Sequence, residues 1–236
     1  MRSNARNSFP KLALTLTFRL PNLRAHTYQI SKYMKKSSLL FLLLGLSVSH
    51  LLAAEEEGFR PLFNGKDTTG WHLRNPQGNK SWSVENGILK NTVNKGSHGT
   101  DLVTDKKFWN FTVKYEYMVP DNSNSGFYLR GRHEIQILGD HASGEASPTG
   151  NGAIYNFKAP DKFVSKPGNE WQTAEATIVG NKITVVLNGV KIHDNVECNK
   201  ATGSELDNKV DQPGSIFLQG DHGTVSFRNN RIKELK

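Results

Sequence analysis

Apolar and polar residues alternate over many short stretches of this chain, and turn-forming residues separate the stretches. In FTVKYEYMV (111–119), every second residue from Phe111 onward is apolar. A period of two is typical of a strand with one buried face. The pattern predicts strands at 81–89, 111–119, 126–130, 134–138, 153–157, 173–179, 182–187, 190–194, 215–219 and 225–227, with Ile232 following.

Turn signals organise these strands into one all-β domain. Gly180-Asn181 and Asn188-Gly189 are two-residue hairpin turns, so 171–194 reads as consecutive antiparallel strands. No long helical pattern appears, which favours a single β-sandwich or jelly roll. Cys198 is the only cysteine, so no intrachain disulfide can form, and the core alone must hold the fold.

The first 54 residues read as a leader that is not part of this domain. Residues 34–54 (MKKSSLLFLLLGLSVSHLLAA) have the basic start, short apolar run and small-residue end of a secretory signal peptide. Residues 1–33 precede that signal, so we expect Met34 to be the true start; a long basic n-region is the alternative. The expected mature domain is 55–236, exported to the periplasm or the medium and free of the membrane after cleavage.

The leader also accounts for the net charge of the whole chain. The chain carries 30 Lys and Arg and 22 Asp and Glu, and eight of the basic residues but none of the acids lie in 1–54. Residues 55–236 therefore have no net charge. This balance gives no reason to expect nucleic acid or an anionic membrane as a partner.

The stretch RGRHEIQILGD (130–140) concentrates polar groups on one strand. Glu134 and Gln136 alternate with two isoleucines, and Arg130 lies just before them. If the predicted strands are neighbours, the residues on their polar faces form one patch suited to a sugar. These residues are Glu116, Arg130, Glu134, Gln136 and Gln219. On pattern alone, a solvated face with ordinary ion pairs is an equally weighted alternative.

A second group lies in QGDHGTVSFRNN (219–230). Asp221 and His222 occupy a turn flanked by glycines, where a histidine beside an acid can act as general base or acid. Arg228 can donate to ligand oxygens or simply close the sheet. Four further residues are expected to contact a saccharide: Asn124, Asp140, Tyr155 and Trp171. For each of them, a role in turn formation or packing is the alternative.

No standard metal or phosphate motif is present. A divalent metal could be held by Glu134, Asp140 or His222, with His133 or His141 nearby, although their spacing matches no known ligand pattern.

Eight segments, in order along the chain, resemble the family of 3-keto-disaccharide hydrolases. They are FNGKDTTGW (63–71), WSVENGIL (82–89), LVTDKKFWNFTVKYEY (102–117), NSGFYLRG (124–131), HEIQILGD (133–140), GAIYNF (152–157), EWQTAEATIVGNKITVVLNG (170–189) and SIFLQGDHGTVSFRNNRIKEL (215–235). The departures are small: Gly220 is an extra residue, and RNN replaces the usual RNI. The resemblance implies a concanavalin A-like jelly roll.

The resemblance also implies a substrate, a glycoside whose C3 hydroxyl has been oxidised to a ketone. Cleavage would then proceed by proton abstraction at C2, elimination of the group on C1, and hydration. The residues first expected to be catalytic are Glu134, His222 and Arg130, with Gln136 as an oxygen donor and Glu116 or Asp221 in support. Two alternatives remain open: a non-catalytic carbohydrate-binding module, and a glycosidase that uses Glu116 and Glu134 as a carboxylate pair.

Overall fold

The computed structural model describes residue 56 and residues 58–236, so the predicted leader lies outside the described residues. Within this part of the chain the strands are joined by turns and loops, with one 3-10 turn, η1 (His141–Ser143). Among the described residues, none of the helices has the length and apolar character needed to cross a membrane.

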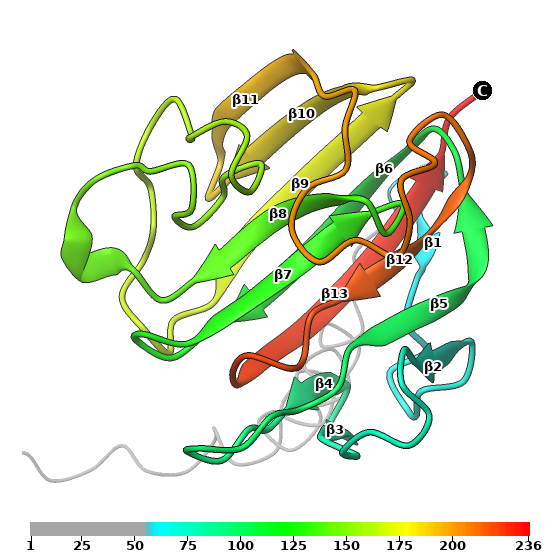
Figure 1. Ribbon diagram of the computed structural model, residues 1–236, viewed down its shortest axis with the longest axis vertical. Coiled ribbons are helices and arrows are strands. Elements are labelled where there is room, and N and C mark those ends of the chain that lie inside the picture. The colour runs from blue at the N-terminus through cyan, green and yellow to red at the C-terminus, as the bar shows by residue number, and fades with distance from the viewer. Residues whose placement is uncertain (1–55, 57) are drawn as a thin grey trace, which may run out of the picture. The chain divides into compact units, whose positions relative to one another are not determined.

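The strands form two antiparallel sheets that face each other (Figure 1). The eight-stranded sheet contains, in spatial order, β11 (Val190–Glu197), β10 (Lys182–Leu187), β9 (Gln172–Val179), β6 (Phe111–Met118), β13 (Val225–Glu234), β4 (Ile88–Asn91) and β3 (Trp82–Glu85), and β1 (Arg60–Pro61) pairs with β13. The five-stranded sheet contains β2 (Trp71–Leu73), β5 (Leu102–Phe108), β12 (Gly214–Leu218), β7 (Asn124–Leu129) and β8 (His133–Leu138). The predicted all-β jelly-roll sandwich is confirmed.

The main core lies between the inner faces of the two sheets. From β6, Tyr115 and Tyr117 point inward, and from β8, Ile135 and Ile137 do the same. Tyr115 stacks on Phe127 of β7 with ring centroids 4.0 Å apart. The alternation in the sequence therefore identifies the inner faces of both sheets.

Three sequence predictions about strands need correction. Residues 81–89 form not one strand but the hairpin β3–β4, because Asn86 and Gly87 adopt positive φ angles of 52° and 78° and reverse the chain. The stretch 153–157 makes only isolated bridges at Ile154 and is no strand. Strand β5 was missed because its first residues are buried consecutively and do not alternate with polar ones.

The five-stranded sheet is covered on its outer face as well. Val103, Tyr128 and Phe217 form a small second cluster there, and Leu206 packs on it from the segment between β11 and β12. This segment, orange in Figure 1, passes in front of β7 and β8. Tyr128 and Phe217 stack with centroids 3.9 Å apart. Burial on both faces explains why almost every residue of β7, β8 and β12 is inaccessible.

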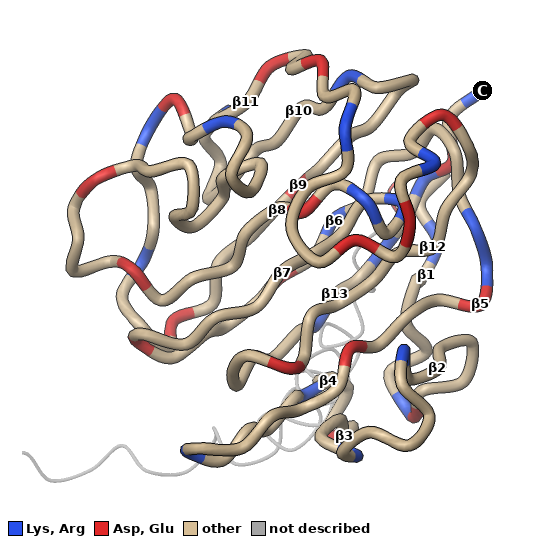
Figure 2. The backbone as a smooth tube through the Cα atoms, in the orientation of Figure 1, with Lys and Arg blue, Asp and Glu red and all other residues tan. Residues whose placement is uncertain are grey.

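Charged residues of both signs are interspersed along the described backbone, as Figure 2 shows. Neither sign gathers over one sheet, which agrees with the balanced charge of residues 55–236.

Candidate functional site

A pocket of about 360 Å³ opens on the outer face of the five-stranded sheet. Its walls come from β7, β8, the loop after β12 and two further loop segments, residues 155–156 and 200–204. Half of the twelve predicted site residues line it: Asn124, Glu134, Gln136, Tyr155, Gln219 and His222. Residues from distant parts of the sequence therefore meet in one pocket.

Strand geometry places Glu134 and Gln136 side by side in the floor of this pocket. Their neighbours Ile135 and Ile137 point into the core, so the two polar side chains point outward. Antiparallel pairing with β7 sets Glu134 opposite Tyr128. The sequence left a saccharide patch and a solvated surface equally open for this face of β8, and in the structure the face is buried.

Glu134 is the most perturbed acid in the pocket. Glu134 is only 2% exposed, and burial raises the pKa of its carboxyl group from 4.5 to about 7. The negative charges of Asp101 and Asp221 act in the same direction, whereas a hydrogen bond from Tyr128 and the proximity of His222 oppose the rise. A carboxyl group with this pKa can take up or release a proton near neutral pH.

Two glycines make room for the Glu134 carboxyl group. A Cβ atom on Gly126 would lie 2.4 Å from Oε1, and one on Gly203 would lie 2.0 Å from Oε2. Gly203 also has a φ of +67°, which side chains rarely adopt. The carboxyl group is therefore held closely from both sides by backbone.

Three side-chain amides contribute further acceptors. Oε1 of Gln136, Oε1 of Gln219 and Oδ1 of Asn124 are buried and have no hydrogen-bond partner among the described residues. Each belongs to a residue that lines the pocket. Buried acceptors of this kind normally have a partner, and the hydroxyl groups of a sugar are donors that fit them.

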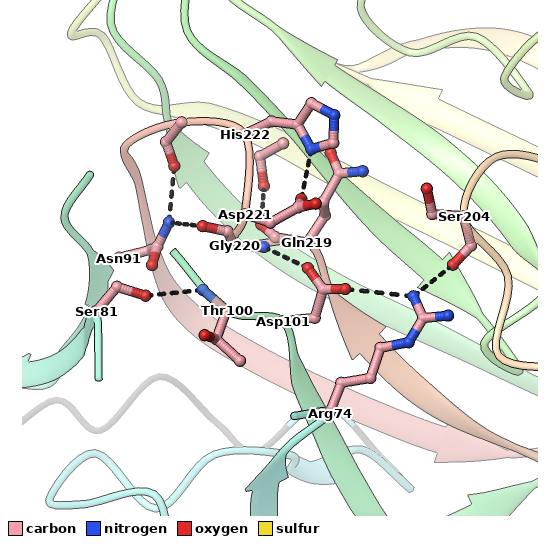
Figure 3. Close-up of polar contacts among 12 residues, drawn as sticks. Arg74, Ser81, Asn91, Thr100, Asp101, Ser204, Gln219, Gly220, Asp221 and His222 are labelled. Atoms are coloured by element: carbon pink, nitrogen blue, oxygen red, sulfur yellow. Dashed lines mark hydrogen bonds and ion pairs between the residues drawn. The ribbon is translucent and has the colours of Figure 1, made fainter. Parts of the chain in front are cut away.

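The loop after β12 brings His222 to the pocket. Nδ1 of His222 hydrogen-bonds Oδ1 of Asp221, which fixes the tautomer and leaves Nε2 as the atom that can exchange a proton with a ligand. Asn91 holds the loop by donating from Nδ2 to the carbonyls of Gly220 (2.8 Å) and Gly223 (2.7 Å). Figure 3 shows this loop with the groups that anchor it.

Arg130 is not part of this site, contrary to the sequence prediction. It follows β7 with a φ of 55°, so the alternation of the strand does not extend to its side chain. Its guanidinium donates to the carbonyls of Trp109 (2.7 Å), Val210 (3.2 Å) and Gly180 (2.5 Å). It also lies 3.7 Å from the centroid of the Trp109 ring. Arg130 therefore holds loops of the fold together.

Glu116, Arg228 and Trp171 lie on the opposite side of the sandwich. The neighbours of Glu116 in β6 point into the core, so Glu116 faces outward from the eight-stranded sheet. There it accepts from Nε of Arg228 at 2.7 Å, and the Arg228 guanidinium lies 4.0 Å from the Trp171 ring centroid. Glu116 and Glu134 thus face away from each other across the core, and the predicted carboxylate pair is wrong.

The residues suggested for a metal do not all meet: Glu134 and His222 line the pocket, whereas Asp140 and His133 do not. Oδ2 of Asp140 accepts the Asn151 N–H at 2.8 Å, away from the pocket. Burial, followed by the charges of Arg130 and Arg132, lowers the pKa of His133 to about 4, and this side chain faces the interior. Across residues 58–236 and residue 56, no group of three or more His, Cys, Asp or Glu side chains is placed to hold a metal ion.

The sequence reasoning missed the loop segment 200–204. Thr202 accepts the Glu134 backbone N–H at 2.9 Å through Oγ1, and the Ser204 N–H donates to the Tyr128 hydroxyl at 2.9 Å. Polar loop composition carries no periodic signal, and the segment falls outside the stretches that resemble the family. The one local signal in this segment is Gly203, because a glycine in a polar loop can mark a position with a positive φ, and its φ is +67°.

The sequence and the fold of this chain are similar to those of known proteins. A family model described as the 3-keto-alpha-glucoside-1,2-lyase-like domain matches residues 58–233. No curated protein matches the chain. Two crystal structures of a candidate glycosyl hydrolase from Parabacteroides distasonis ATCC 8503 are similar at 26% identity. One has a TM-score of 0.62 and covers 76% of this chain and 84% of its own; the other has a TM-score of 0.60 and covers 76% and 95%. These findings support a carbohydrate-active role for the chain.

Proposed function

The chain belongs to the family of 3-keto-alpha-glucoside-1,2-lyase-like domains, and on that premise we propose that it cleaves glycosides whose C3 hydroxyl has been oxidised to a ketone. The observation that carries this proposal is the Glu134 carboxyl group, which is buried in the wall of a polar pocket and has a pKa of about 7. A base of this strength suits the removal of a carbon-bound proton that a neighbouring ketone has acidified.

The chemistry that such a substrate undergoes is an elimination. The base takes the C2 proton, and the electron pair of the C2–H bond forms an enolate with the C3 oxygen. The enolate then expels the C1 substituent: the C1–O bond breaks, and its electron pair leaves with the aglycone oxygen, which takes up a proton. Addition of water across the resulting C1–C2 double bond gives the free 3-keto sugar, so the net result is hydrolysis.

The pocket residues can fill these roles. Glu134 is the base for the C2 proton, and His222, oriented by Asp221 and protonated on both ring nitrogens, supplies the Nε2 proton to the leaving oxygen. The amide groups of Gln136 and Gln219 can donate N–H groups to the enolate oxygen and accept from the sugar hydroxyls. Arg130, which the sequence placed among the catalytic residues, has no role in this scheme because its guanidinium is bound to backbone carbonyls outside the pocket.

The test compares a 3-keto glucoside with its unoxidised parent and follows aglycone release, with and without a chelator. We expect release from the keto sugar alone, with a strong loss of kcat in Glu134→Gln and His222→Ala. Glu116→Gln is the matched control, because it makes the same change on the opposite face of the sandwich and should retain full activity.

The other outcomes each point to a different function. Binding of the saccharide without release from either sugar would refute the enzyme proposal for these substrates and indicate a binding module. Release from the unoxidised parent would indicate an ordinary glycosidase. Loss of release with the chelator would add a metal requirement.

A further inference from the structure

Two segments that are distant in the sequence both line the pocket. We call residues 200–206 the Ser204 segment and residues 219–223 the His222 loop. Neither is a strand, and each has its own anchor: the Ser204 segment is held to the five-stranded sheet through the Tyr128 hydroxyl, and the His222 loop to the eight-stranded sheet through Asn91. Catalysis of the proposed kind needs the two segments in a fixed relative position, because Glu134 lies against Gly203 of the Ser204 segment and His222 belongs to the His222 loop.

One ion pair contacts both segments at once. Oδ1 of Asp101 accepts the backbone N–H of Gly220 in the His222 loop at 2.9 Å. Its Oδ2 lies 3.3 Å from Nη1 of Arg74. Arg74 in turn donates from Nη1 to the Ser204 carbonyl (2.8 Å) and from Nη2 to the Glu205 carbonyl (2.9 Å). Figure 3 shows Asp101 and Arg74 between Gly220 and Ser204.

Strand pairing holds the backbones of Arg74 and Asp101 side by side. Arg74 follows β2 and Asp101 precedes β5, and these strands pair so that Leu73 lies opposite Leu102. The Arg74 N–H also donates to the Asp101 carbonyl at 2.9 Å. The Asp101 side chain is 9% exposed, and the Arg74 guanidinium lies 5.5 Å from the centroid of the Phe217 ring. The planar guanidinium of Arg74 has several donors in fixed directions, so it can contact Asp101 and the two carbonyls at once, which a lysine ammonium group cannot do as well.

We propose that Arg74 and Asp101 are a positioning pair that fixes the Ser204 segment and the His222 loop relative to each other, and so holds His222 across the pocket from Glu134. The catalytic part of this inference rests on the proposed function, whereas the mechanical part does not. Neither residue lines the pocket, so neither is expected to touch the substrate. Their loss should therefore lower kcat more than it raises KM.

The variants are Arg74→Ala, Arg74→Lys and Asp101→Asn, with Arg60→Ala as the matched control. Arg60 resembles Arg74 in pairing with an acid, Glu234 at 2.7 Å, and in lying over a ring, Phe108 at 5.6 Å, but it has no contact with either segment. Hydrogen exchange of backbone amides in 203–206 and 219–223 reports the mechanical coupling without any substrate.

We expect Arg74→Ala to accelerate exchange in both segments and Arg60→Ala to change neither. Displacement of catalytic groups by about an ångström costs on the order of 100-fold in rate, so kcat should fall about 10- to 100-fold in Arg74→Ala. Arg74→Lys should lower kcat less than Arg74→Ala does, because the lysine keeps a positive charge beside Asp101. It should still lower kcat relative to the wild type, because a lysine cannot reach the carbonyls of both Ser204 and Glu205. If Arg74→Ala does not fold, the lysine variant and Asp101→Asn carry the test.

Asp101→Asn adds a measurement that a purely structural role would not affect. The asparagine keeps an acceptor for the Gly220 N–H but removes the negative charge of Asp101, which acts on Glu134. The other groups that act on Glu134 are Asp221, His222 and Tyr128, and the substitution leaves them in place. Because the Asp101 charge raises the pKa of Glu134, the acid limb of the kcat/KM profile should move to lower pH.

Unchanged exchange in the His222 loop of Arg74→Ala, or equal losses in Arg60→Ala, would overturn the inference. If the wild-type protein cleaves no 3-keto glucoside, the proposed function fails, and the exchange data still decide whether the pair couples the two segments.

Discussion

Replacement of Glu134 by glutamine should make the protein more stable at alkaline pH while removing its activity. The glutamine has the shape of the protonated acid, and its Oε1 can accept the hydrogen bond that Tyr128 makes with the carboxyl group. The native protein must keep a carboxylate in a buried wall above neutral pH, and the variant avoids this cost.

The magnitude follows from the pKa of Glu134, which rises from 4.5 to about 7 on folding. The folded protein therefore binds this proton more tightly than the unfolded chain does, so stability is greatest below about pH 4.5 and falls as the pH rises to about 7. Each pKa unit corresponds to about 1.4 kcal/mol, which gives a loss of about 3 kcal/mol for the wild type. This is a large part of a typical unfolding free energy of about 5–15 kcal/mol.

Urea unfolding of both proteins at pH 5 and pH 8 measures this effect. Glu134→Gln should be more stable by about 1 kcal/mol at pH 5 and by about 3 kcal/mol at pH 8. Contributions from other titrating groups are common to both proteins and cancel in the difference. The same stability difference at both pH values, or a less stable variant at pH 8, would refute the argument that burial raises this pKa.

Three other predictions test the pocket and its supports. Gly203→Ala should abolish activity and destabilise the protein by several kcal/mol, because the added Cβ would collide with the Glu134 carboxyl group. Gly144→Ala is the control: Gly144 also has a positive φ, of 68°, but open space around it, so the substitution should cost only the backbone strain of about 1–2 kcal/mol. Urea unfolding measures the stability of both variants, and aglycone release measures their activity. Arg130→Met should lower the unfolding free energy by about 1–3 kcal/mol for each of the three backbone carbonyls that it leaves without a donor, but the folded fraction should keep its kcat. A catalytic role would instead lower kcat at unchanged stability. The kcat/KM for a 3-keto glucoside should rise with pH through about 7, as Glu134 ionises, and a flat profile from pH 5 to 9 would exclude it as the base.

Export of residues 55–236 remains a prediction, because residues 1–54 lie outside the described part of the chain. N-terminal sequencing of the protein recovered from its cells would test it: a start at residue 55 would support the signal peptide, and a start at Met1 would contradict it.

The sequence alone was sufficient to identify the fold class and one part of the site. The period of two in 111–119 and in 134–138 assigned the buried faces of β6 and β8, because alternation along a strand directly determines which side chains face the core. The same alternation set Glu134 and Gln136 on one face, and the turn residues around His222 placed it in a loop. These are local properties, which a few neighbouring residues determine.

The tertiary structure decided which polar faces meet. Alternation shows that Glu116 and Glu134 both face away from the core, but it does not show that they belong to different sheets, because sheet membership depends on pairings between distant strands. Arg130 has the spacing of a site residue, yet its positive φ, set by the turn after β7, sends its guanidinium to carbonyls elsewhere. The raised pKa of Glu134 depends on a loop about 70 residues away that covers the sheet, and burial by distant segments leaves no local pattern in a sequence.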